Sequence, residues 1–130
     1  YKKITIKKEL SPLYPITIDI NLMTRVISNL VENGIKYSNE GCEILVKSWD
    51  DEKWVYIEII DNGPGIPIEE LQHIFEKFYR IKNDASHSIK GSGLGLYLVK
   101  YFVELHGGTI SVTSVQNVET KFLVKFKNLS

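Results

Sequence analysis

The chain has 130 residues, a length that suits one domain with a single hydrophobic core. Its 43% hydrophobic and 25% charged residues are typical of a globular protein, and its 16 basic residues balance 16 acidic ones. This neutral balance does not indicate nucleic-acid binding or an acidic disordered tail. Cys42 is the only cysteine, which excludes an internal disulfide and a thiolate metal cluster.

The sequence shows neither a membrane span nor a signal peptide. No apolar run approaches the roughly 20 residues that a membrane-spanning helix needs. Because the chain opens at Tyr1 without an initiator methionine, we expect it to be a piece of a longer protein. A membrane anchor, where that protein has one, would lie in another part.

The first elements in chain order are a strand and a long helix. Alternation over residues 2–9 predicts the strand, and prolines at 12 and 15 end it. Asp19 or Asn21 is the expected cap of a helix that runs to about Lys36. The apolar stripe of this helix consists of Met23, Val26, Ile27, Leu30, Val31 and Gly34.

The rest of the chain alternates between predicted strands and predicted helices. Expected strands are 43–49, 54–60, 109–115 and 120–127, and expected helices are 68–75 and 93–106. A Gly/Pro-rich turn covers 61–67, a polar loop covers 81–92, and glycines after His106 predict a helix stop. This interleaving predicts an α+β fold with a mixed, mostly antiparallel sheet, covered on one face by about three helices.

Two asparagines and a lysine share one edge of the first long helix. Asn29 and Asn33 are one helical turn apart, and Lys36 continues the edge. Amide oxygens can help to complete an oxygen shell around Mg²⁺, and an ammonium group can meet a phosphate. The alternative interpretation is a solvated helix face, which is what such residues usually form.

A carboxylate comes directly after the strand 54–60. Asp61 stands in the string Asp61-Asn62-Gly63-Pro64-Gly65-Ile66, where it can accept a hydrogen bond from an exocyclic amine such as that of adenine. Glycines without Cβ atoms let the backbone pass close to a flat ring. The alternative is a common Gly/Pro turn.

A second glycine-rich string opens the helix 93–106. It contains Gly91, Ser92, Gly93, Leu94, Gly95 and Leu96. Free N–H groups at a helix start bind phosphate, although a flexible hinge would look the same. The string follows a polar loop instead of a strand, which argues against a dinucleotide-binding fold. The sequence contains neither a P-loop nor the Ser/Thr/Tyr kinase motifs.

An aromatic string precedes the polar loop. Phe75, Phe78 and Tyr79 are expected to pack in the core, and Arg80 is either a surface residue or a phosphate clamp.

These four strings, in this order and spacing, resemble the boxes of sensor histidine kinases, in the wider group that includes gyrase and Hsp90-type ATPases. The resemblance covers roughly residues 18–127 of what we expect to be a single domain, 1–130. Its boxes are the N box (about 22–38), the first glycine box (61–67), the F box (75–80), the ATP lid (about 81–92) and the second glycine box (91–96). It implies a two-layer, Bergerat-type ATP-binding fold.

The resemblance also implies roles for single residues. Asn33 would ligate Mg²⁺, and Asn29 would lie beside the phosphates and the metal. Lys36 and Arg80 would contact phosphate, and Tyr37 would line the ribose and adenine. Asp61 would bind the adenine amine in a pocket shaped by Gly63, Gly65 and Ile66. The second glycine box, Gly91 to Leu96, would wrap the phosphates.

Three positions depart from the family pattern. Gly34 stands where alanine is usual, and Arg25 stands where glutamine is common. Thr120 lies where the family has a threonine near adenine, but the glycines around that threonine are absent from Gln116-Asn117-Val118-Glu119. We therefore expect a different hairpin there.

The implied reaction is transfer of the γ-phosphoryl group of ATP to a histidine. Related ATPases carry a glutamate as general base where this chain has Asn29, and a neutral amide cannot take a proton from water. None of His73, His87 and His106 lies in a phosphoacceptor string, so we expect the acceptor histidine on a separate dimerisation domain. We expect His106 to cap a helix end and the other two to lie on the surface.

The implied setting is a cytoplasmic domain, monomeric alone, of a dimeric kinase that serves a response regulator. The alternatives are an anti-sigma-type serine kinase and a nucleotide-binding scaffold without catalysis.

Overall fold

The computed structural model describes residues 5–10, 19–37, 41–79 and 95–127. The described strands form one five-stranded sheet in the order β1-β2-β3-β5-β4. Their bounds are β1 (Thr5–Leu10), β2 (Glu43–Asp50), β3 (Trp54–Asp61), β4 (Thr109–Val115) and β5 (Glu119–Lys127). β1 pairs in parallel with β2, and the other neighbours are antiparallel. The predicted mixed, mostly antiparallel sheet is confirmed.

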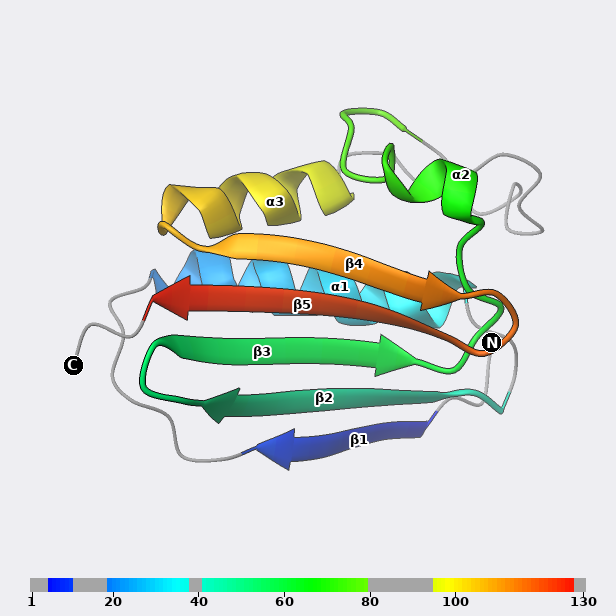
Figure 1. Cartoon of the computed structure of the whole chain (residues 1–130), viewed down its shortest axis with the longest axis horizontal. Coiled ribbons are helices and arrows are strands. Elements are labelled where there is room, and N and C mark those ends of the chain that lie inside the picture. Colours follow the sequence, from blue (N-terminus) through cyan, green and yellow to red (C-terminus); the bar gives the residue numbers. More distant parts are fainter. Residues whose placement is uncertain (1–4, 11–18, 38–40, 80–94, 128–130) are drawn as a thin grey trace.

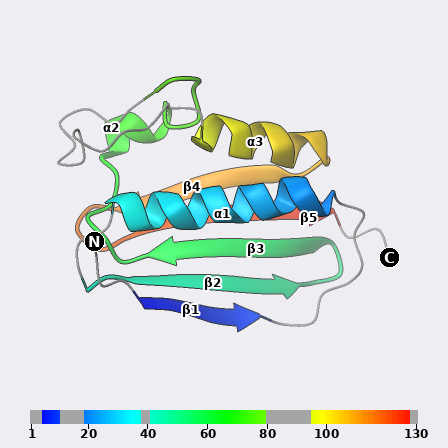
Figure 2. The same ribbon diagram turned by 180° about the vertical axis from the view of Figure 1, so that it is seen from behind.

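The helices cover one face of this sheet. They are α1 (Ile20–Tyr37), α2 (Ile68–Leu71) and α3 (Gly95–Leu105). α1 crosses behind the sheet in Figure 1 and in front of it in Figure 2, and α3 packs against α1 beside β4. The predicted two-layer α+β architecture is confirmed. None of the described helices combines the length and the apolar character that a membrane crossing requires.

The core lies between the helices and the sheet. Burying each large apolar side chain stabilises the fold by about 1.5–3 kcal/mol before conformational entropy is counted. The buried apolar residues include Met23, Val26 and Leu30 of α1, Val99 and Val103 of α3, and Ile44, Val55, Ile59, Phe122, Val124 and Phe126 of the sheet. Three of the six predicted stripe residues of α1 are thus in the core, Gly34 is also buried, and Ile27 and Val31 are half-buried.

Capping residues fix one end of the helical layer, where α1 begins and α3 ends. Asp19 caps α1, because its Oδ1 accepts the N–H of Leu22 at 3.1 Å. At the end of α3, His106 Nδ1 donates to the carbonyl oxygen of Phe102 at 2.7 Å, as expected for a helix-end cap. The chain then turns through Gly107, whose φ of +74° favours glycine.

One predicted element is shorter than expected. The helix predicted over 68–75 ends at Leu71. The chain continues as tight turns, in which the N–H groups of His73, Glu76 and Tyr79 each donate to the carbonyl three residues earlier. These turns repeat every three residues. Over so short a segment, the apolar pattern in the sequence does not distinguish such turns from an α-helix.

Candidate functional site

The candidate site lies at one end of the molecule. α1 and β3 both finish there, and α2, the first turn of α3 and the β4–β5 hairpin lie at the same end (Figures 1 and 2). The predicted N box, first glycine box and F box, and the start of α3, are therefore brought to one side of the fold. These strings are separated by up to several tens of residues in the sequence.

Asp61 is the last residue of β3, and it is half-buried. Burial raises the pKa of Asp61 above its ordinary value. A hydrogen bond of 3.0 Å from the N–H of Gly63 to Oδ1 works in the opposite direction but is the smaller effect. A carboxylate whose ionised form is poorly solvated is well placed to gain from a ligand that donates a hydrogen bond.

Two neighbours define the surroundings of Asp61. A Cβ atom built on Gly34 would lie 3.7 Å from Oδ2 of Asp61 and 3.1 Å from Cδ1 of Ile44. Gly34 therefore brings α1 close to the carboxylate. Across the sheet, Asp61 pairs with Thr120 of β5, which is 4% exposed. Directly paired residues present their side chains on the same face.

The loop after Asp61 is held by the β4–β5 hairpin. Gly65 has a φ of +78°, and a Cβ atom there would lie 2.9 Å from the Cα of Gln116 and from Oγ of Ser114. Asn117 donates its N–H to the carbonyl oxygen of Pro64 at 2.6 Å. Glycine is thus required at 65 both by conformation and by space.

The hairpin that lacks the family glycines reaches its turn by another residue. Asn117 has a φ of +65°, a conformation that asparagine tolerates better than most residues. The structure thus accommodates the departure noted at 116–119 and still places Thr120 beside Asp61.

Ser114 is a residue that sequence reasoning missed. Its Oγ accepts the N–H of Ile66 at 2.7 Å and lies 3.2 Å from Oγ1 of Thr120. It connects the first glycine box to the strand that carries Thr120. A serine in an alternating strand gives no local signal of such a contact, because its partner Ile66 is 48 residues away.

The polar edge of α1 is half-buried. Asn29, Asn33 and Lys36 have intermediate exposure, unlike Glu32 and Ser28 on the outer face. Amide oxygens are hard donors that suit Mg²⁺. Within the described ranges, no three His, Cys, Asp or Glu side chains gather into a metal cluster.

Several predicted site residues fall outside the described residues. These are Arg80, Gly91, Ser92, Gly93, Leu94 and the loop 81–92, together with the side chain of Tyr37. Of the second glycine box, Gly95 and Leu96 are described, and they form the first turn of α3.

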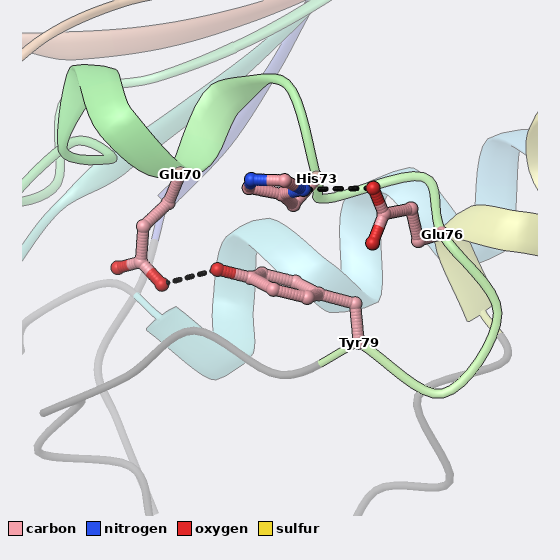
Figure 3. Close-up of polar contacts among 4 residues, drawn as sticks. All are labelled: Glu70, His73, Glu76 and Tyr79. Carbon is pink, nitrogen blue, oxygen red and sulfur yellow. Dashed lines mark hydrogen bonds and ion pairs between the residues drawn. The ribbon is translucent and has the colours of Figure 1, made fainter.

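Polar contacts join the F box to the residues that precede it (Figure 3). Glu70 is 7% exposed, and Tyr79 donates its hydroxyl hydrogen to Oε1 of Glu70 at 2.6 Å. The ring of Tyr79 stacks on His73, and Nδ1 of His73 lies 2.7 Å from Oε2 of Glu76. His73 is partly exposed, in line with its expected surface position, and His87 lies outside the described residues.

The aromatic F-box residues do not all behave as predicted. Phe75 packs edge-to-face on Phe122 of the core, as expected. Phe78 is 62% exposed and has a φ of +66°, so the expectation of core packing is wrong for this residue. The left-handed turn at Phe78 swings its ring outward and brings Tyr79 onto the turn instead.

Comparison with known protein families gives one clear match. The family described as histidine kinase-, DNA gyrase B- and HSP90-like ATPase matches residues 18–129. Among curated relatives, the sensor protein RprX of Bacteroides fragilis is 42% identical over 104 residues. The sensor protein SrrB of Staphylococcus aureus is 36% identical over 109 residues. The matches cover 78% and 84% of this chain but only 20% and 19% of those proteins, so the chain spans about a fifth of their length.

Solved structures match over nearly the whole chain. The mycobacterial sensor histidine kinase MprB superposes with a TM-score of 0.81 at 30% identity, over 95% of this chain and 81% of that one. The catalytic domain of the histidine kinase ThkA gives 0.80 at 27% identity, over 96% and 80%. Full-length ShkA in complex with AMPPNP gives 0.80 at 25% identity, over 94% of this chain and 25% of that one.

Proposed function

Because the chain belongs to the family of histidine kinase-, DNA gyrase B- and HSP90-like ATPases, we propose that it is the domain of a sensor histidine kinase that binds Mg·ATP and presents the γ-phosphoryl group to a histidine. The similarity to sensor proteins over about four fifths of the chain supports this assignment within the family. The acceptor histidine lies on a separate dimerisation and phosphoacceptor domain, which passes the phosphoryl group to a response regulator. The domain acts in the cytoplasm, where ATP is available.

Asp61 would recognise adenine. The observation that carries the proposal is the partly buried carboxylate of Asp61 at the end of β3. Its desolvated carboxylate accepts the exocyclic amine of adenine, which relieves the cost of burying the charge. Gly34 lets α1 approach the carboxylate and Gly65 lets the β4–β5 hairpin approach the loop, and the buried Ile66 would give the site an apolar wall, with Gly63 beside it. The complex of ShkA with AMPPNP supports adenine nucleotide as the ligand class.

Phosphate and metal binding fall to α1 and the second glycine box. The amide oxygen of Asn33 would ligate Mg²⁺, Asn29 would lie beside the phosphates and the metal, and Lys36 would contact phosphate. Tyr37 would line the ribose and adenine. Arg80 and the backbone of Gly91, Ser92, Gly93, Leu94, Gly95 and Leu96 would complete the phosphate contacts, with 81–92 as the expected lid. The bound Mg²⁺ would neutralise charge on the β- and γ-phosphates.

The residue at position 29 decides between hydrolysis and transfer. An asparagine amide has no basic site with which to activate water, so hydrolysis is slow. A neutral imidazole nitrogen is itself a nucleophile and needs only to be placed in line with the γ-phosphorus. The chain therefore holds the donor nucleotide, and a partner domain supplies the acceptor.

Nucleotide titration of a matched pair of variants tests this proposal. Asp61→Ala should weaken ATP binding by about 1–3 kcal/mol in calorimetry, because it removes the acceptor for the adenine amine. Glu52→Ala removes an exposed carboxylate from the β2–β3 turn, at the other end of β3, and should bind ATP like the unmodified chain. Unchanged ATP affinity in Asp61→Ala would exclude the site.

A further inference from the structure

We propose that Ser114 is a positioning residue that makes the chain select a 6-amino purine over a 6-oxo purine by fixing the direction of the Thr120 hydroxyl. The proposal rests on the adenine site described above and adds a determinant of base specificity to it. Ser114 acts through Thr120 and does not itself touch the base.

Ser114 belongs to a row of three residues on neighbouring strands. It lies on β4 directly opposite Thr120 of β5, and Thr120 lies in turn directly opposite Asp61 of β3. Three residues on three neighbouring strands thus form one row on the helix-covered face of the sheet. Side chains paired in this way lie within about 4.5–5.5 Å at their Cβ atoms.

The hydroxyl group of Ser114 has one proton to donate and several neighbours. Oγ of Ser114 contacts three groups: the N–H of Ile66 at 2.7 Å, the carbonyl oxygen of Glu119 at 3.1 Å and Oγ1 of Thr120 at 3.2 Å. The carbonyl oxygen can only accept, so it takes the single hydroxyl proton of Ser114. The N–H of Ile66 can only donate. Either hydroxyl could donate in the contact between Ser114 and Thr120, and we infer that Thr120 is the donor because the proton of Ser114 is directed at Glu119.

The contact with Ser114 determines what the hydroxyl of Thr120 can offer to a ligand. With its only proton directed at Ser114, the Thr120 oxygen presents lone pairs alone to its other surroundings. Thr120 is 4% exposed, so water cannot readily supply a different partner. Because Thr120 is paired with Asp61, the proposed adenine site would then offer two acceptors, a carboxylate and a hydroxyl oxygen. Adenine presents an amine donor at position 6, whereas a 6-oxo purine presents an acceptor there.

Ser114 is itself held firmly. A Cβ atom at position 65 would lie only 2.9 Å from Oγ of Ser114, so the loop and the serine are packed together too closely for any side chain there. The N–H of Ile66 fixes the hydroxyl from the loop side. The direction of the Thr120 proton is thus set by the first glycine box through Ser114.

The experiment compares ATP with inosine triphosphate, which carries a 6-oxo group. Calorimetry on the whole chain gives the ratio of the two dissociation constants. Ser114→Ala should reduce the preference for ATP by about five- to tenfold, because Thr120 can then rotate and donate toward the base. Ser114→Thr keeps a hydroxyl and should restore the preference. Thr113→Ala removes a hydroxyl from the opposite face of the same strand and should change nothing.

A second variant separates base selection from general folding. If Ser114 acts through Thr120, then Ser114→Ala should have no further effect on the ratio when Thr120 is already valine. Additive effects of the two substitutions would contradict the proposal, as would a ratio in Ser114→Ala equal to that of the unmodified chain. An unmodified chain that binds ATP no better than inosine triphosphate would contradict the adenine site itself. A failure of the adenine site is thereby distinguished from a failure of the role proposed for Ser114.

Discussion

The backbone N–H of Asp19 donates a hydrogen bond of 3.0 Å to Nε2 of His106, 87 residues along the chain. Because Nδ1 of the same ring donates to Phe102, His106 must be the neutral tautomer with its proton on Nδ1. One imidazole therefore joins the first residue of the α1 cap to the last turn of α3. This link fixes the relative position of the two helices that cover the sheet.

The His106 link predicts a graded loss of stability. His106→Ala removes both hydrogen bonds and should lower the free energy of unfolding by about 1 kcal/mol, because the bonds are partly exposed to competing water. His106→Gln keeps an acceptor within reach of Asp19, and His106→Asn keeps a donor near Phe102. Each should lose about half of that amount in urea titrations. An alanine variant as stable as the unmodified chain would show that the link is incidental.

The Glu70–Tyr79 contact predicts a shifted phenol titration. The hydrogen bond to Glu70 raises the pKa of Tyr79 from 10.0 to about 12. Since the folded state holds this proton more tightly, the stabilisation is complete below about pH 10 and is lost as the pH rises toward 12. Tyr56, which donates to Asp51, also has a raised pKa, so ultraviolet titration should show more than one late-ionising tyrosine, and Tyr79→Phe should remove the step near 12. Glu70→Gln should return it toward 10. A step near 12 that persists in Tyr79→Phe would assign it to another tyrosine.

The raised pKa of Asp61 predicts opposite effects on stability and on binding. Burial disfavours the ionised form, so above the ordinary pKa of 3.8 this carboxylate destabilises the folded chain. Asp61→Asn should therefore be at least as stable at neutral pH, while its ATP affinity falls. In the unmodified chain, ATP affinity should decline as the pH falls through the raised pKa. The asparagine variant corrects for protonation of the nucleotide itself. A parallel pH dependence in both proteins would contradict the role of the carboxylate.

The Asn33 edge predicts a loss that is specific to the metal. Asn33→Ala should reduce the Mg²⁺-dependent part of ATP binding more than binding in the presence of a chelator. Ser28→Ala, on the exposed face of the same helix, serves as the control and should leave both unchanged. Equal losses with and without Mg²⁺ would mean that Asn33 supports the helix and not the ion.

Much of the fold follows from local pattern. The Asp19 cap and the apolar stripe define α1, and alternation defines the strands of the β2–β3 and β4–β5 hairpins to within about one residue. These signals are local, because a cap or an alternating strand is written in a few neighbouring residues. The order of the boxes then identified the family, whose match to residues 18–129 confirms it.

What the sequence could not predict depends on distant contacts. The role that we propose for Ser114 rests on its contacts with Ile66 and Thr120, and no spacing within β4 indicates these contacts. Glu70 reads as a surface residue of a short acidic helix, yet the turn at Phe78 brings Tyr79 back to cover it. The β4–β5 hairpin was expected to differ from the family pattern, but only the structure shows that Asn117 supplies the left-handed turn.

Phosphoryl transfer to a separate acceptor domain tests the central claim most directly. The chain is incubated with γ-labelled ATP and Mg²⁺, alone and with the dimerisation domain of its own kinase added in trans. Alone it should release phosphate slowly and acquire no label, because Asn29 cannot activate water and no acceptor string is present. With the acceptor domain, label should appear there in an acid-labile, base-stable form, as expected of phosphohistidine. Strong self-labelling of the isolated chain, or acid-stable label on a serine of the partner, would contradict the account.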